Sequence, residues 1–165
     1  MTSRPSVAAA RAGMMTSVTA PEIVIGDTRH EHIRIRVLGR THPGAQDSAE
    51  ANWLVSPISI AVGGFTAEIP AALRSDELHR FREGLEQVQR SAAGTAVLKS
   101  IEAWISLAVV HEANGTLSVT GSADDQPGIG NTLRFAFDGL DAALLEPLVV
   151  SLRACEEQFP VVEGP

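Results

Sequence analysis

Two histidines, His30 and His32, stand two residues apart in a segment that is typical of a β-strand. At this spacing both imidazoles lie on the same side of a strand, where they could hold a metal ion together. No second His, Cys or carboxylate pair stands at a recognised ligand spacing. A solvated strand face therefore explains the two histidines better, and we predict neither a metal site nor a cofactor.

Candidate nucleophiles and acid–base pairs are also few. No serine lies in a G-x-S-x-G pattern. The single cysteine, Cys155, falls in a predicted apolar helix with no His or Asn beside it in sequence, so we expect a packed, inert thiol. Four aspartates cluster in sequence near the last hairpin and helix, but turns and helix N-caps explain them better than catalysis. They are Asp124, Asp125, Asp138 and Asp141. The sequence thus predicts a binding protein and no enzyme.

Size and charge limit the remaining classes. A chain of 165 residues with 44% hydrophobic and 20% charged residues suits one globular domain with an apolar core. The net charge of −7 disfavours direct binding to nucleic acid or to an anionic membrane surface, and it suits a basic protein partner. No apolar run approaches the roughly 18 to 20 residues of a membrane span. We predict an unstructured leader over residues 1–22 and a single domain over residues 23–165; Met14 or Met15 could replace Met1 as the translation start.

Alternating apolar residues predict several strands. Ile33, Ile35 and Val37 share one face of the first. After a polar loop over residues 41–50, a second strand follows in which Pro57 requires a sheet edge or a bulge. Leu54, Ser56, Ile58, Ile60 and Val62 are expected to share one face of this strand. A glycine pair at residues 63–64 then predicts a hairpin to the next strand.

A helical period begins at Ser75 or Asp76, with Ser75 as the expected N-cap and Gly94 as the terminator. Residues 95–113 are typical of one long or broken strand, and the Asn114–Gly115 pair predicts a hairpin after it. A further strand and a second helix over about residues 141–158 complete the chain. This order predicts an α+β fold: a two-layer sandwich of a mostly antiparallel sheet with two helices packed on one face.

The order of five short stretches resembles the WapI-type immunity proteins. The stretches are EANWL at 50–54, SDELHRFREGLEQV at 75–88, GTAVLKSIEAWISL at 94–107, NTLRFAF at 131–137 and LDAALLEPLVVSL at 140–152. The chain departs from the pattern at Glu50, where the family commonly has Asp, and at Ala142 and Ala143, which replace polar and aromatic residues. The structural motif positions that the resemblance assigns are Asn52, Trp53, Glu102, Trp104 and Asp141.

The resemblance implies a small bacterial cytoplasmic protein without enzymatic activity. The family's founding type binds the toxic tRNase domain of a contact-dependent toxin, so we expect this chain to bind and mask a cognate toxin domain, with a nuclease as the expected class. An acidic surface could cover a toxin's basic substrate groove. Charge and loop position nominate seven contacts: Asp47, Glu50, Asp124, Asp125, Asp138, Glu156 and Glu157.

Two alternatives remain open. The chain could be a homodimeric structural or regulatory domain that uses an exposed sheet face, so both monomer and homodimer are compatible with the sequence. That face would carry Arg34, Arg36, Trp53 and Trp104. Trp53 itself could be an exposed anchor for a partner. We favour a structural role instead, in which Asn52 pins the turn after the 41–50 loop, with help from the Glu50 carboxylate, and Trp53 covers the sheet beside Trp104.

Overall fold

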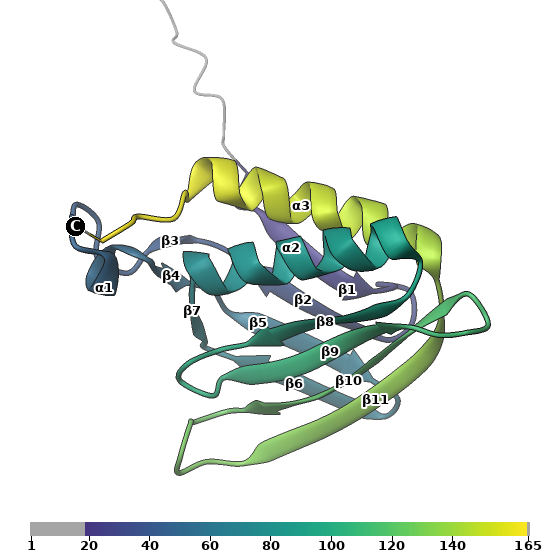
Figure 1. Cartoon of the computed structure of the whole chain (residues 1–165). Coiled ribbons are helices and arrows are strands. Elements are labelled where there is room, and N and C mark those ends of the chain that lie inside the picture. Colours follow the sequence, from purple (N-terminus) through teal and green to yellow (C-terminus); the bar gives the residue numbers. More distant parts are fainter. Residues whose placement is uncertain (1–18, 165) are drawn as a thin grey trace, which may run out of the picture.

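The computed structural model describes residues 19–164 and confirms the α+β class (Figure 1). Within this range the strands form three antiparallel sheets, where one mostly antiparallel sheet was expected. The N-terminal sheet has the order β1 (Glu22–Gly26), β2 (His32–Arg36), β5 (Ile58–Val62), β6 (Phe65–Ile69). The C-terminal sheet has the order β11 (Thr132–Asp141), β10 (Thr116–Asp124), β9 (Ile105–His111), β8 (Gly94–Lys99). A small sheet joins β3 (Gly39–Arg40), β4 (Trp53–Val55) and β7 (Ala72–Arg74).

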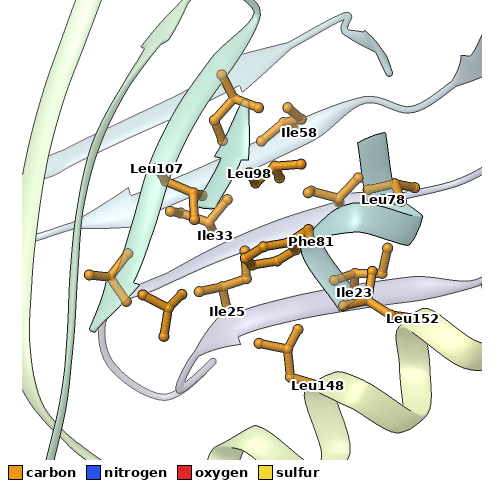
Figure 2. Close-up of a cluster of buried hydrophobic side chains, with 14 of the residues drawn as sticks. Ile23, Ile25, Ile33, Ile58, Leu78, Phe81, Leu98, Leu107, Leu148 and Leu152 are labelled. Carbon is orange, nitrogen blue, oxygen red and sulfur yellow. The ribbon is translucent and has the colours of Figure 1, made fainter. Parts of the chain in front are cut away.

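The two four-stranded sheets contribute to one hydrophobic core. Alternation places Ile33 and Ile35 of β2 fully inside, as the sequence predicts. Phe81 lies between isoleucines of the N-terminal sheet and leucines of the C-terminal sheet (Figure 2). The predicted face from Leu54 to Val62 is also buried throughout, including the polar Ser56.

Two longer helices lie side by side along one side of the sheets (Figure 1). Helix α2 (Ser75–Ser91) packs against β8 and against helix α3 (Leu145–Gln158), and α3 also packs against β1. A single 3-10 turn, Ala142–Leu144, leads into α3. The edge strands β1 and β8 are thus the strands beside the helices, whereas β6 and β11 end the two sheets on the opposite side. No helix among residues 19–164 has the length and apolar character needed to cross a bilayer.

The ends of α2 differ from the prediction. Ser75 is the first helical residue and not the N-cap, because Arg74 holds the cap position. Ala92, with φ of 49°, ends the helix in the left-handed conformation, and Gly94 begins β8. Ser75 instead directs its hydroxyl toward Asn52, which changes its role from local cap to tertiary contact.

Pro57 marks the point where the chain changes sheets. The expected single strand is divided there into β4 of the small sheet and β5 of the N-terminal sheet. The Ser56 hydroxyl accepts the Leu73 N–H at 2.7 Å and thereby ties this bend to β7. A residue without an N–H is compatible with a break of this kind because it requires no partner there.

The run over residues 95–113 is a hairpin and not one strand. β8 and β9 pair antiparallel, and the chain reverses over residues 100–104, where Ala103 has φ of 61°. The predicted hairpin at Asn114–Gly115 is confirmed by the pairing of β9 with β10. The 41–50 loop ends in a short helix, α1 (Ser48–Ala51). Of the predicted leader, residues 1–18 lie outside the described residues, and β1 already begins at Glu22.

Candidate functional site

Asp124, the last residue of β10, and Asp125, the first residue of the turn into β11, are two of the nominated contacts. Asp124 Oδ1 accepts the Thr132 hydroxyl at 2.7 Å, and Asp125 accepts the Asn131 backbone N–H at 2.7 Å and its side-chain amide at 3.0 Å. The side-chain and backbone hydrogen bonds from Asn131 lower the pKa of Asp125. The Asp125 carboxylate therefore favours its ionised form while it holds the turn.

Asp138 lies at the other end of the same hairpin. The register shifts between Leu117 and Val119, so β11 carries a bulge at Asp138 and Gly139, where Gly139 has φ of 70°. The bulge leaves the Asp138 side chain exposed at the surface. Asp138 lies six positions along the strand from Thr132, which is about 20 Å at the usual rise. Asp138 and the Asp124–Asp125 pair therefore belong to different patches.

Glu156 joins α3 to α2 through ion pairs. Its carboxylate contacts the His79 imidazole and accepts from Arg82 Nε at 2.6 Å. Partial burial opposes ionisation, but the hydrogen bonds from Arg82 and His79 outweigh it and lower the pKa of Glu156. The Arg82 guanidinium also donates to Glu86 at 2.7 Å, and Arg153 donates to the same Glu86 oxygen at 2.8 Å. Glu156 therefore fastens the helix pair, whereas its neighbour in the chain, Glu157, is exposed.

Asp47 and Glu50 lie at helix α1. Asp47 is the N-cap, and its Oδ1 accepts the N–H groups of Ala49 at 3.0 Å and of Glu50 at 3.1 Å. The carboxylate that holds this turn is therefore that of Asp47, whereas we had nominated Glu50 for it. Glu50 itself is exposed.

The seven nominated acids are distributed over four separate parts of the surface: α1, the end of β10 with the turn that follows it, the bulge of β11 and α3. Four of them hold local structure through hydrogen bonds: Asp47, Asp124, Asp125 and Glu156. The exposed members without a side-chain hydrogen bond to the described residues are Glu50, Asp138 and Glu157. The acidic charge therefore does not form one concentrated patch from these residues.

Asn52 is a buried junction of three segments. Its amide nitrogen donates to the carbonyl oxygens of Ser48 at 3.0 Å and Val162 at 2.9 Å. Its Oδ1 accepts the Ser75 hydroxyl and the Val162 N–H, both at 2.8 Å. All four hydrogen-bonding positions of the side chain are thus used. We call this arrangement the Asn52 clasp: it joins α1, the start of α2 and the segment after α3.

Two arginines surround the clasp. Arg40 donates to the carbonyl oxygens of Ala51 and, at 2.6 Å, of Pro160. Arg74 donates to Ala49 and Ser48 carbonyl oxygens at 2.9 and 3.0 Å, and its guanidinium lies 5.2 Å from the centroid of the half-buried Trp53 ring. These contacts satisfy the free carbonyl groups at the end of α1.

The Ser100–Ile105 turn between β8 and β9 carries the second motif. Trp104 is half-buried and its Nε1 donates to the exposed Glu102 at 3.3 Å. The buried Glu77 of α2 accepts the Ile101 N–H at 2.7 Å and the Arg74 N–H at 2.9 Å. Burial outweighs these hydrogen bonds and raises the pKa of Glu77. Glu77 thus ties the start of α2 to this turn.

The face proposed for a homodimer is divided in the structure. Arg34 and Arg36 lie on β2 of the N-terminal sheet, Trp53 on β4 of the small sheet, and Trp104 in the turn before β9. These four residues therefore do not share one sheet face, and no contact joins the two tryptophan side chains among the described hydrogen bonds and ring interactions.

The remaining chemistry-bearing residues have structural surroundings. Cys155 is buried as predicted, and burial, with a smaller contribution from Glu156, raises the pKa of its thiol to about 11. Asp141 Oδ1 accepts the Ala143 N–H at 2.9 Å at the 3-10 turn before α3. In residues 19–164 no three His, Cys, Asp or Glu side chains are grouped as metal ligands would be.

Sequence reasoning missed three residues that organise this region: Arg40, Arg74 and Glu77. Glu77 lies in the first turn of α2 and is buried although its side chain is a carboxylate. One local signal was available for Glu77: it is an acid at the third residue of the helix that follows Arg74. A carboxylate at this position can accept the N–H of the cap residue. No local pattern marks the two arginines, since their acceptors are backbone carbonyl groups distant in sequence.

Comparison with known proteins gives one match. The family described as "Immunity protein WapI-like family" matches residues 23–160. No curated protein and no solved structure matches the chain.

Proposed function

Because the chain belongs to the WapI-like immunity protein family, we propose that it protects its cell by binding and masking a cognate toxin domain in the cytoplasm. The match over residues 23–160 is the observation that carries this proposal, since it covers nearly all of the described fold. Inhibition would need no chemistry. A stoichiometric complex that covers the toxin's substrate groove excludes the substrate.

The charge of the chain supports a basic toxin, with a nuclease as the proposed class. A nuclease groove binds a phosphate backbone and is therefore positive, whereas this chain has a net charge of −7. Opposite potentials accelerate association and fix the orientation of the partner. The exposed carboxylates of Glu50, Asp138 and Glu157 are the nominated acids with the most freedom to turn toward a partner.

Co-expression tests the proposal directly. A secreted protein encoded by a neighbouring reading frame supplies the toxin domain, and its toxicity is measured with and without this chain in the same cells. We expect survival only when the chain is present, together with a 1:1 complex on co-purification. Equal killing in both cultures would end the immunity proposal.

Charge variants then test the masking surface. Asp138→Lys and Glu157→Lys should slow association with a basic toxin, and the difference from the unmodified chain should shrink in high salt. Glu163→Lys, at an exposed carboxylate outside the nominated set, is the matched control. If all three variants associate at the same rate, these acids do not steer the partner. The homodimer alternative is tested by light scattering, because a dimer that persists at low concentration would favour it.

A further inference from the structure

A groove of about 410 Å³ lies between the two sheets on the side opposite the helices. All five residues of β6, from Phe65 to Ile69, line one wall. The other wall comes from the ends of β10 and β11, with Ala123 and Leu133 as apolar members. Phe65 is 67% exposed, and Ile129, in the turn between the lining residues Asp125 and Asn131, is 88% exposed. The groove therefore presents apolar surface to solvent.

This side of the molecule also has both free sheet edges. β1 and β8 pack against α3 and α2, but β6 and β11 have a strand partner on one side only within the described residues. An edge strand directs alternate N–H and C=O groups outward, ready to pair with another strand. The Gly63–Gly64 turn determines which backbone groups of β6 point outward. Val62 and Phe65 flank this two-residue turn and form a hydrogen-bonded pair, so the backbone groups of Phe65 point toward β5. Hydrogen-bonded and non-hydrogen-bonded pairs alternate along the ladder, and the N–H of the next residue, Thr66, therefore points to the open edge.

The charge of the groove selects its partner. The lining contains two carboxylates, Glu68 and Asp125, and no Lys, Arg or His. Two copies of this chain joined along β6 would bring these carboxylates together without a compensating cation. A partner strand with basic side chains meets no such repulsion.

We propose that β6 is the docking edge for an extended basic segment of the toxin, which adds a fifth strand to the N-terminal sheet and fills the groove. The inference rests on the proposed immunity function and names the part of the surface that performs it. Ala67 and Ile69 face inward, so alternate apolar side chains of the added strand pack over them and against Leu133. The intervening basic side chains lie beside Glu68 on the outer face. Main-chain pairing supplies affinity, and the groove supplies selectivity.

A synthetic peptide tests the groove without the toxin. The probe is a fluorescent, terminally blocked heptapeptide of alternating Lys and Val, and its anisotropy is measured against the full chain. An alternating Glu and Val peptide is the control. We expect saturable binding of the Lys peptide only. Glu68→Gln should weaken it about two- to fivefold, as for an exposed ion pair, whereas Glu163→Gln, at an exposed carboxylate outside both the groove and the nominated contacts, should leave it unchanged.

Backbone pairing is tested at the edge itself. Thr66→Pro removes the N–H from the open edge and should weaken peptide binding about tenfold or more, whereas Thr66→Val keeps the N–H and should bind normally. Melting curves check that both variants fold. Two peptides N-methylated at the Lys or at the Val positions repeat the test on the unmodified chain. Since a strand pairs through alternate residues, only one of them should lose binding. Equal behaviour of the two peptides would exclude strand pairing.

The toxin complex separates this inference from the immunity proposal. Hydrogen exchange at Thr66 and Glu68 amides should slow in the complex. If the toxin binds and these amides exchange as before, β6 is not the docking edge and the immunity function stands. If the toxin is not bound at all, the immunity proposal fails, and the peptide assay still decides what the groove accepts. A stable dimer whose formation is abolished by Thr66→Pro would assign the edge to a second copy and overturn the inference.

Discussion

Asn52→Ala should open the junction of α1, α2 and the segment after α3. The substitution deletes four side-chain hydrogen bonds. At about 0.5 to 1.5 kcal/mol each, they amount to about 2 to 6 kcal/mol. The Ser48 carbonyl keeps Arg74 as a donor, and the half-buried Val162 can separate and become hydrated. Because of these compensations, we expect the free energy of unfolding to fall by about 2 to 4 kcal/mol, in the lower half of that range. A loss of this size lowers Tm by about 5 to 15 °C in a domain of this size.

Urea unfolding followed by circular dichroism measures the loss, and limited proteolysis reports whether residues 159–164 detach first. Asn131→Ala is the matched control, because Asn131 is exposed and its amide donates only to the turn carboxylate Asp125. The control should cost no more than about 0.5 kcal/mol, as is usual for surface substitutions. A loss below about 1 kcal/mol for Asn52→Ala, or equal losses for the two variants, would refute the assignment of Asn52 as a structural junction.

Three further predictions concern single side chains. Trp53→Ala should lower stability by about 2 kcal/mol through lost packing and lost contact with Arg74, while affinity for the toxin per folded molecule is retained; melting and titration measure the two effects. Hydrogen bonds from Arg153 and Arg82 lower the pKa of Glu86 below its ordinary 4.5. The contribution of the ionised Glu86 carboxylate to the stability of the fold is therefore complete above pH 4.5 and is lost as the pH falls through the folded-state pKa. The stability difference between the unmodified chain and Glu86→Gln should therefore shrink in acid, and urea titrations at several pH values show whether it does. The Cys155 thiol, with its pKa raised to about 11, should react with a disulfide reagent at pH 8 only after unfolding; rapid reaction of the native chain would contradict its burial.

The elements that the sequence predicts well are those with local signals. Alternation at Ile33 and Ile35 defines β2, and the Asn114–Gly115 pair defines the hairpin of β9 and β10. The turn of β8 and β9 was missed because its left-handed residue is Ala103, where Gly or Asn is usual. Ser100 and the distant Glu77 hold that turn. Tertiary contacts therefore stabilise this turn in place of a local turn residue. A short stretch of sequence cannot reveal such a contact, because Glu77 and the turn are far apart along the chain.

The candidate site was less predictable than the fold. An acidic composition correctly implies surface carboxylates, but it does not distinguish a free one from one that holds a turn. Asp47 and Asp125 have the same charge as Asp138, yet the first two accept backbone N–H groups nearby. The groove along β6 was missed for another reason. Its two walls are more than 50 residues apart in sequence, and only the order of the strands in the two sheets brings them together.

The Asn52 clasp also has a consequence for the kinetics of folding. The four strands of the C-terminal sheet follow one another in sequence, so their hairpins close over short loops. The contact from Asn52 to Val162 spans 110 residues, and its closure costs more chain entropy than any of these hairpins. The clasp should therefore form after the rate-limiting step. Asn52→Ala should then leave the refolding rate unchanged and accelerate unfolding on the order of 100-fold. The buried asparagine would thus control the lifetime of the folded state through the unfolding rate, without influence on the folding rate.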